Sequence, residues 1–397
     1  MPDVSYRSVL LISCRRNPDM SCQALAEWNL IKMNFFLEEQ MKRLILAAAA
    51  SSMLATPVFA EEVKLGIIFG FTGPIESLTG PMASGAELAM KEVSDSGLLL
   101  GGSTVVALRG DSTCIDSAAA VAAAERLVTA DKVNAIVGGD CSGVTGAILQ
   151  NVARPNGVVM ISPSATSPAL STAEDDGLFF RTSPSDARQG QIMTEILMEQ
   201  GIKTVPVTYT NSDYGKGLAE AFEAAFVAAG GTVTINAAHE DGKADYSAEI
   251  GALASAGGDR LVIAGYIDQG GGGILRAALD QGAFDTFHFP DGMISSNLED
   301  NFGDEVDGST GQHPGTDSPG AAAVADMGKA NGFDGSSPFT PESYDAAALI
   351  LLAMQAAGSS DSADFKSKVM DVANAPGEKI FPGELAKALK IIADGGE

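Results

Sequence analysis

The chain has 397 residues, and 25 Lys and Arg stand against 51 Asp and Glu, so its formal net charge is −26 at pH 7. This balance argues against a nucleic-acid or anionic-membrane partner, because phosphate binding needs clusters of Lys and Arg. An acidic excess of this kind is typical of a solvated surface. The length after residue 60 corresponds to about two domains.

Residues 41–60 have the layout of a secretory signal peptide. Met41-Lys42-Arg43 is basic, Leu44–Leu54 is mostly apolar, and Val58-Phe59-Ala60 predicts cleavage after Ala60. The apolar run is too short for a permanent membrane span, and the alternative is a hydrophobic N-terminal helix of a cytosolic fold. Because signal peptides begin a chain, we expect residues 1–40 to be a mis-assigned upstream extension.

From residue 63 onward, short β-branched runs alternate with alanine-rich amphipathic stretches. The pattern predicts strands over 63–69, 104–109, 135–137 and 158–161, with helices over 77–96, 116–128 and 144–153 between them. This βαβ alternation indicates a parallel sheet with helices on both faces.

The alternation restarts after residue 183. Helices are expected over 187–200, 216–229, 246–256 and 274–281, and strands over 204–209, 232–235, 261–264 and 286–289. A Gly/Ser/Asp/Pro-rich stretch at 308–319 is followed by predicted helices over 321–330, 341–357, 363–373 and 383–393.

These late helices have few strands left to pair with, so they would fit best against the first sheet. The sequence therefore predicts two doubly wound α/β lobes joined by more than one crossing. Lobe 1 comprises 61–181 and 306–397, and lobe 2 comprises 182–305. Since the chain stops directly after a predicted helix, we expect its C-terminus to be truncated before a final strand.

Cys114 and Cys141 are the two cysteines beyond residue 60. An even number in an exported protein favours a disulfide, which would close a loop of roughly 27 residues and stabilise the fold by a few kcal/mol. Two unpaired buried cysteines are the alternative.

The stretch Gly139–Gly143 also fits the nucleophile elbow of a secreted α/β hydrolase that uses Cys141. Such an enzyme needs a free thiolate and a histidine base. Only His239, His288 and His313 are available as bases, and a disulfide would silence the thiol. The hydrolase is therefore a remote alternative.

Small hydroxyl residues follow two successive predicted strands. Ser142 comes after the first strand, and Ser162–Pro168, read Ser-Pro-Ser-Ala-Thr-Ser-Pro, comes after the second. Hydroxyls and backbone N–H groups at strand ends suit a small polar ligand. The same residues also form ordinary turns, which is the other interpretation.

With Cys114 and Cys141-Ser142, the Ser162–Pro168 turn resembles that of the branched-chain amino-acid (Leu/Ile/Val) binding proteins of bacterial ABC transporters. These are type I periplasmic binding proteins. Further motifs follow in the same order, namely Gly73-Pro74, Asp213-Tyr214-Gly215-Lys216-Gly217, Gly265-Tyr266 and Pro290-Asp291-Gly292. The resemblance covers about residues 63–397 and implies a receptor that closes its lobes around an amino acid and delivers it to an inner-membrane permease.

The resemblance also implies a set of ligand contacts. The ligand carboxylate would meet Ser142 and the turn Ser164-Ala165-Thr166, which agrees with the affinity of anions for hydroxyls and backbone N–H groups. The ammonium would meet Asp291, with Tyr214 and Tyr266 closing over it. Phe71 and Leu78 would shape the side-chain pocket. Without the resemblance, Asp291-Gly292 is also an ordinary turn pair and both tyrosines are packing candidates.

Two features depart from the family pattern. The family's acid is commonly Glu, whereas Asp291 is one methylene shorter, and Glu76 and Leu78 stand near a position where the family often has an aromatic residue. Asp213 and Asp268 add further negative charge near the expected cleft. A ligand with extra positive charge, or one without a carboxylate, therefore stays open.

We expect a periplasmic monomer that is not an enzyme and uses neither a cofactor nor a metal. Gly270–Gly273 lacks the Lys-Ser/Thr of a phosphate loop, and Asp241, Asp245 and Glu249 lack calcium-loop spacing. The alternative function on the same fold is a periplasmic sensing domain for amides or other small metabolites.

Overall fold

Two five-stranded sheets, parallel throughout, organise the chain. The computed structural model describes residues 61–315 and 318–396, so the expected signal peptide and upstream extension lie outside the described residues. The first sheet has the order β2-β1-β3-β4-β5, and its strands are β1 (Glu62–Phe69), β2 (Thr104–Asp111), β3 (Ala135–Gly138), β4 (Val159–Ser162) and β5 (Phe179–Arg181).

The second sheet has the order β10-β9-β8-β6-β7. Its strands are β6 (Thr204–Thr210), β7 (Thr232–His239), β8 (Leu261–Ala264), β9 (Phe287–Phe289) and β10 (Thr310–Gly311). Every residue of β3, β4 and β8 is buried, as expected for a parallel sheet covered on both faces. The predicted fold class, two doubly wound α/β lobes, is confirmed.

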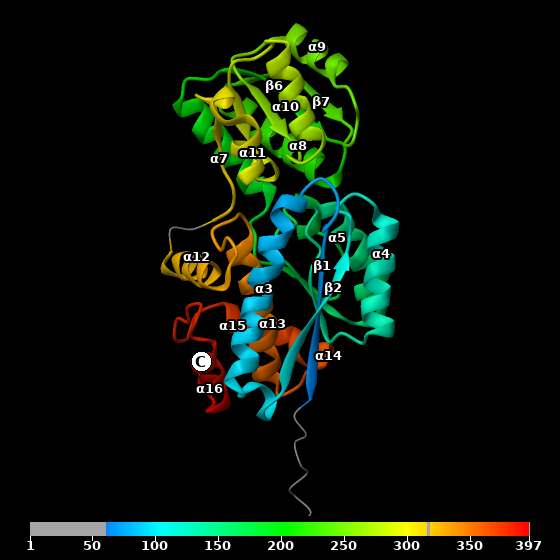
Figure 1. The fold of residues 1–397 in the computed structure, drawn as a ribbon, viewed down its shortest axis with the longest axis vertical. Coiled ribbons are helices and arrows are strands. Elements are labelled where there is room, and N and C mark those ends of the chain that lie inside the picture. Colours follow the sequence, from blue (N-terminus) through cyan, green and yellow to red (C-terminus); the bar gives the residue numbers. More distant parts are fainter. Residues whose placement is uncertain (1–60, 316–317, 397) are drawn as a thin grey trace, which may run out of the picture. The chain divides into compact units, whose positions relative to one another are not determined.

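Helices cover both faces of the first sheet. Figure 1 shows α3 (Glu76–Ser96) beside α13 (Thr340–Ala357) on one side, and α4 (Ser117–Glu125) and α5 (Ser142–Ile148) on the other. The α3 and α13 backbones approach closely at Gly85, where an added Cβ would lie 2.6 Å from the carbonyl oxygen of Thr340. The late part of the chain thus packs on the first lobe.

The other helices of this lobe are α6 (Arg154–Asn156), α12 (Pro319–Asn331), α14 (Ser362–Phe365), α15 (Val369–Ala373) and α16 (Leu385–Ala393). The helix expected over 363–373 is interrupted by a 3₁₀ turn at Lys366–Lys368, which separates α14 from α15.

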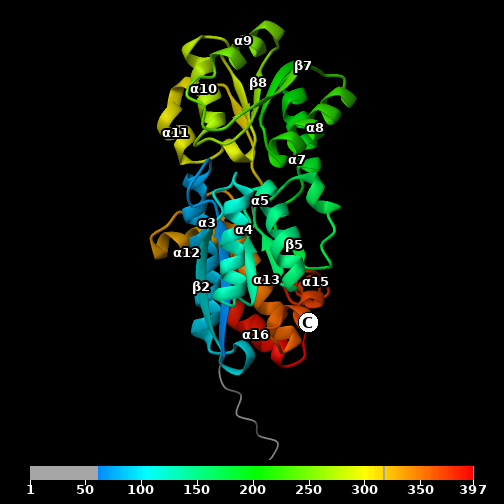
Figure 2. The ribbon, with the colours of Figure 1, turned by 90° about the vertical axis from the view of Figure 1, so that its right-hand side faces the viewer.

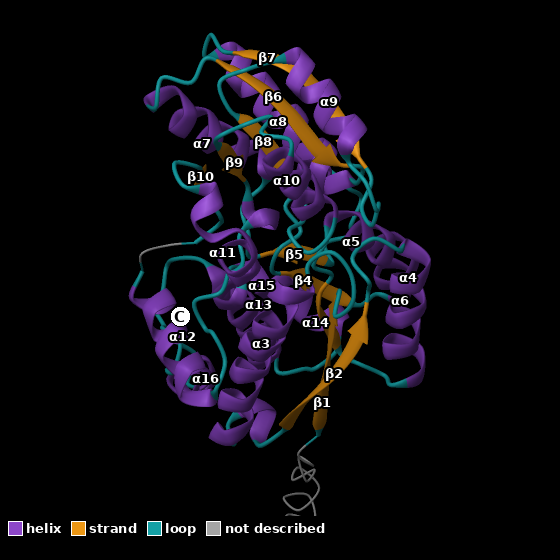
Figure 3. Cartoon of the chain, turned by 45° about the horizontal axis from the view of Figure 1, so that its top comes forward, coloured by secondary structure: helices purple, strands orange, loops and turns teal. Residues whose placement is uncertain are grey.

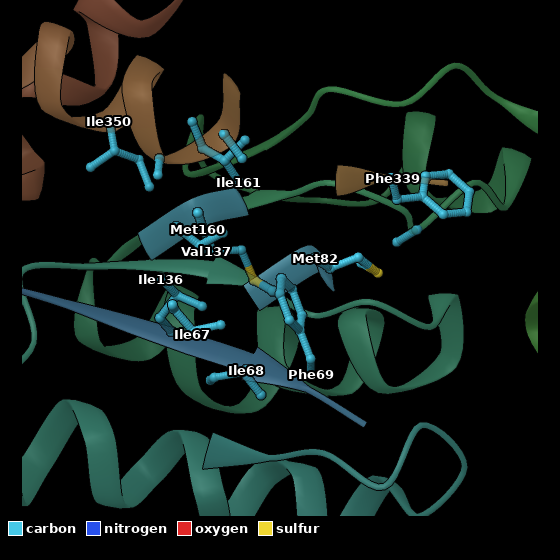
Figure 4. Packing of buried hydrophobic residues seen from close by; sticks show 14 of the residues in the cluster. Ile67, Ile68, Phe69, Met82, Ile136, Val137, Met160, Ile161, Phe339 and Ile350 are labelled. Atoms are coloured by element: carbon cyan, nitrogen blue, oxygen red, sulfur yellow. The ribbon is translucent and has the colours of Figure 1, made fainter. Parts of the chain in front are cut away.

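The first lobe's core fills both faces of its sheet, and one part of it lies between the sheet and α3 and α13. Figure 4 shows Ile67, Val137 and Ile161 of three neighbouring strands, with Ile350 of α13 close to Ile161. All four side chains are completely buried. Burial of this kind stabilises by about 1.5–3 kcal/mol for each large aliphatic side chain.

In the second lobe, α7 (Asp186–Glu199) and α8 (Asp213–Ala228) cover one face of the sheet (Figure 2). The other face carries α9 (Ser247–Ala256) and α10 (Gly270–Asp280), and α11 (Ser296–Phe302) follows β9. Strand β10 pairs with β9, so the second sheet extends to Gly311, beyond the expected lobe boundary at 305.

The first crossing between the lobes runs from β5 to α7 (Figure 3). The Thr182 hydroxyl donates a hydrogen bond to the carbonyl of Glu342 at 2.9 Å, which ties the crossing to α13. Ser185 caps α7 by accepting the Ala187 N–H. None of the described helices has the length and hydropathy needed to cross a bilayer.

Candidate ligand-binding cleft

Cys114 and Cys141 are joined by a disulfide that links the loops after β2 and β3. Asp140 strengthens this junction, since its buried carboxylate accepts the Gly70 N–H at 2.6 Å and the Ser112 hydroxyl at 3.0 Å. Burial raises the pKa of Asp140 although these hydrogen bonds favour the charged form. The three loops that follow β1, β2 and β3 are therefore fixed to one another.

The hydroxyl-rich turn after β4 is built mostly on its own hydrogen bonds. Ser164 donates its hydroxyl to the Asp140 carbonyl at 3.0 Å, and Ser142 Oγ accepts the Ser167 N–H at 3.1 Å. Ser162 Oγ accepts the Ala165 N–H at 2.9 Å. Thr166 Oγ1 is buried and has no hydrogen-bond partner among the described residues. Ser142 and Ser164 thus shape the turn, and the Thr166 hydroxyl is buried within it near Asp186, whose pKa it lowers.

Asp291 begins a 3₁₀ turn after β9 and is 2% exposed. Its Oδ1 accepts the Tyr214 hydroxyl at 2.6 Å and Gln189 Nε2 at 2.8 Å. Burial raises the pKa of Asp291, and these two hydrogen bonds oppose that rise. The Tyr214 and Tyr266 rings stack with centroids 5.1 Å apart. The second lobe therefore offers one buried carboxylate beside an aromatic pair.

Gly292 lets the turn that carries Asp291 pack closely against Gly265 and Tyr214. A Cβ added there would lie 2.6 Å from the Gly265 carbonyl oxygen and 3.0 Å from the Tyr214 hydroxyl. The Pro-Asp-Gly sequence therefore needs its glycine for space between two loops of the second lobe.

One pocket brings the two lobes together. Its lining combines apolar, aromatic and polar side chains from both lobes: Ile75, Leu78, Met82, Asp140, Cys141, Ser142, Ser164, Tyr214, Tyr266, Asp291, Gly292 and Phe339. Six expected site residues are in this set, namely Ser142, Ser164, Tyr214, Tyr266, Asp291 and Leu78.

The other three expected residues lie outside that lining. Ala165 and Thr166 are buried in the turn behind Ser164. Phe71 lies under the Arg109 guanidinium, 5.2 Å from its ring centroid. Their contribution to binding stays a prediction.

Sequence reasoning missed much of the apolar wall. Met82 lies one helical turn beyond Leu78 on α3, so the i, i+4 spacing was a usable signal. Phe339 precedes α13 in a left-handed conformation, with φ at 64°. It comes from the far end of the chain, where no local pattern indicates proximity to the cleft.

Glu76, Asp213 and Asp268, three other acids expected near the cleft, are not part of the pocket lining. Glu76 and Asp213 are exposed. Asp268 Oδ2 accepts the Ser77 N–H at 2.9 Å, and the Asp268 N–H donates to the Pro74 carbonyl at 3.2 Å. Asp268 therefore reaches from the second lobe to the N-terminus of α3 in the first.

Residues 62–383 match the family model described as periplasmic binding protein. The chain belongs to this family. A Leu/Ile/Val-binding protein, BraC3, of Rhizobium johnstonii is 29% identical over 81% of this chain and 86% of its own length. Leu/Ile/Val-binding protein homolog 1 of Brucella melitensis is 30% identical over 76% of this chain and 80% of its own length.

Solved structures agree with this membership. The branched-chain amino acid transporter substrate-binding protein LivJ of Streptococcus pneumoniae, in complex with isoleucine, is 26% identical with a TM-score of 0.68, over 78% of this chain and 88% of its own. The leucine-binding protein LivK of Thermotoga maritima is 25% identical with a TM-score of 0.68, over 77% and 87%. The expected family and its type I periplasmic binding protein fold are confirmed.

Proposed function

We propose that this periplasmic binding protein is the receptor of an ABC importer and captures an apolar amino acid between its lobes. One observation carries the proposal. A single pocket places the buried Asp291 carboxylate and two stacked tyrosines opposite a hydroxyl-rich turn and beside an apolar wall. An amino acid presents the complementary groups, a cation, an anion and a side chain.

Each part of the ligand has a matching partner. The ammonium would form a charge-assisted hydrogen bond with Asp291. The carboxylate would face the turn Ser164-Ala165-Thr166 and the N-terminal region of α5 at Ser142. The side chain would pack on Ile75, Leu78, Met82 and Phe339, four apolar residues of the lining. The relatives from Rhizobium johnstonii and Brucella melitensis, which are Leu/Ile/Val-binding proteins by name, support this class.

The surrounding function follows from the same proposal. The protein would be exported by the signal peptide at 41–60, cleaved after Ala60, and would act as a periplasmic monomer that delivers its ligand to the permease. The disulfide removes the Cys141 thiolate that a hydrolase would need. A non-enzymatic role is therefore the better reading of the site.

Isothermal titration against L-leucine, L-isoleucine, L-valine, L-lysine and benzoate tests the proposal. Leucine, isoleucine or valine should bind. Benzoate lacks an ammonium group and should not bind, because it leaves the buried Asp291 without a cationic partner. Absence of binding by every amino acid in the set contradicts the proposal.

A further inference from the structure

Asp186 is a further buried acid, behind the pocket lining that contains Asp140 and Asp291. It is the first residue of α7 and is completely buried. Neither carboxylate oxygen has a hydrogen-bond partner among the described residues. Its backbone N–H donates to the Thr166 carbonyl at 2.8 Å. The pocket lining does not include Asp186, so this carboxylate lies behind the ligand-facing surface.

Asp186 and Asp291 belong to one polar cluster. Gln189, one helical turn after Asp186 on α7, donates its amide to Asp291. Burial, followed by repulsion from Asp291, raises the pKa of Asp186 well above its ordinary value, while the Thr166 hydroxyl and Arg181 oppose this rise. Because Gln189 lies one turn from Asp186 on α7 and donates to Asp291, the two buried carboxylates belong to one cluster in which each charge affects the other.

Among the described residues, no cation forms a salt bridge with either acid, although the Arg181 charge lowers the pKa of Asp186. The Arg181 guanidinium donates to the carbonyls of Ala165 and Ser167, each at 3.0 Å, and to the Ser171 hydroxyl, so these three hydrogen bonds go to groups other than the two acids. The other titratable groups that act on the pair or its tyrosine partners are His313, Tyr214, Tyr266, Asp140 and Asp241.

Two adjacent carboxylates in a buried site do not both ionise, because the burial cost and the mutual repulsion add. The N-terminus of α7 favours negative charge near Asp186 but supplies only about half of a positive charge. A proton on one of the two acids removes the conflict.

We propose that Asp186 and Asp291 hold one proton between them in the ligand-free protein, and that the ligand's cationic group displaces this proton into solvent. The inference rests on the proposed function, since it needs a cation at Asp291. The charges balance. Two carboxylates and one proton carry −1 before binding, and two carboxylates with one ligand cation carry −1 afterwards.

The proposal makes Asp186 a positioning residue that selects for positive charge. Asp186 does not touch the ligand. The pair of acids becomes fully ionised only when a ligand cation at Asp291 replaces the shared proton. A neutral group at Asp291 cannot displace the proton. Since the pair loses a proton on binding, affinity should rise with pH, by up to about tenfold per pH unit while the free pair is protonated.

Titration calorimetry with L-leucine in buffers of different ionisation enthalpy tests this on the intact protein. Titrations from pH 5 to 8 should show wild-type protein releasing close to one proton in the range where its affinity rises. The Asp186→Asn variant keeps the shape of the side chain but leaves Asp291 without an acidic neighbour. It should release far less proton and show a flatter pH profile.

Two control variants test whether the released proton comes from a group other than Asp186 and Asp291. Asp304→Asn removes an exposed acid of the same lobe, and His313→Gln removes the imidazole that acts on Asp291. Both variants should keep the wild-type proton release.

Leucine binding without proton release overturns the inference and leaves the proposed function intact. Unchanged release in D186N, or its loss in H313Q, also overturns the inference. Failure of all amino acids to bind instead overturns the proposed function, and the proton pairing with it. The wild-type measurement decides the question even if D186N does not fold.

Discussion

Asp268 should act as a latch between the lobes. Helix α3 begins after Ile75, which provides no side-chain cap. The missing cap comes from the opposite lobe, where Asp268 Oδ2 accepts the Ser77 N–H at 2.9 Å. Asn297 Nδ2 holds the other oxygen, Oδ1, at 2.6 Å. A helix N-terminus in one lobe is thus capped by a carboxylate of the other.

The cost of removing this cap can be worked out. Replacing an N-cap side chain by Ala costs about 0.5–2 kcal/mol. Because the contact joins the two lobes, it stabilises only the form in which they are in contact. Removing it should therefore lower the affinity for a ligand that binds between the lobes. At 1–2 kcal/mol, Asp268→Ala should weaken leucine binding by roughly 5- to 30-fold.

The assay is calorimetry for affinity together with a displacement chase for the dissociation rate. The loss should appear mainly as faster dissociation, since the latch holds the ligand-bound form. Asp268→Asn retains an acceptor oxygen and should fall between wild type and D268A. Ser295→Ala removes the 3.2 Å contact with the Ser77 hydroxyl and the cap that Ser295 Oγ gives to the Asn297 N–H of α11. Because it leaves the Asp268 contact with the Ser77 N–H in place, it should have a smaller effect on affinity. Wild-type affinity and dissociation rate in D268A would refute the latch.

Three further predictions concern the site and the stability of the fold. Asp291→Asn should weaken leucine binding by about 1.5–3 kcal/mol, the value of a hydrogen bond to a charged group, and unchanged calorimetric affinity would remove Asp291 from the site. Replacing Cys114 and Cys141 by Ala opens a loop with a sequence separation of 27, which should lower the free energy of unfolding by about 3.5 kcal/mol in urea titrations; an unchanged midpoint would contradict this. Burial raises the pKa of Glu342 from 4.5 to about 7. The folded state then retains a proton that the unfolded chain has lost, so stability should fall from pH 4.5 to 7 by up to roughly 3 kcal/mol. Glu342→Gln should reduce that slope, and an identical slope would show that Glu342 is not its source.

The architecture was predictable because βαβ alternation is a local signal. Strands expected over 63–69 and 261–264 match β1 and β8 to within a residue. Strand β10 was not predicted, because its two residues, Thr310 and Gly311, are too few to show a periodic pattern. Only its pairing with β9 defines it as a strand.

The site was predictable where its residues follow strands or belong to family motifs. Tyr214, Asp291 and Ser142 meet in one pocket although they are far apart in the sequence. Asp268 was expected to add charge to the cleft, but its partner on α3 is decided by how the lobes meet. Asp186 begins a helix, where an acid is ordinary, and only burial beside Asp291 distinguishes it.

A crystal structure of the protein with L-leucine would test the proposed binding mode directly. We expect the ammonium within hydrogen-bond distance of Asp291, the carboxylate at the Thr166 turn and the side chain against Leu78, Met82 and Phe339. Leucine bound outside this pocket, or with its carboxylate toward Asp291, would contradict the proposed function.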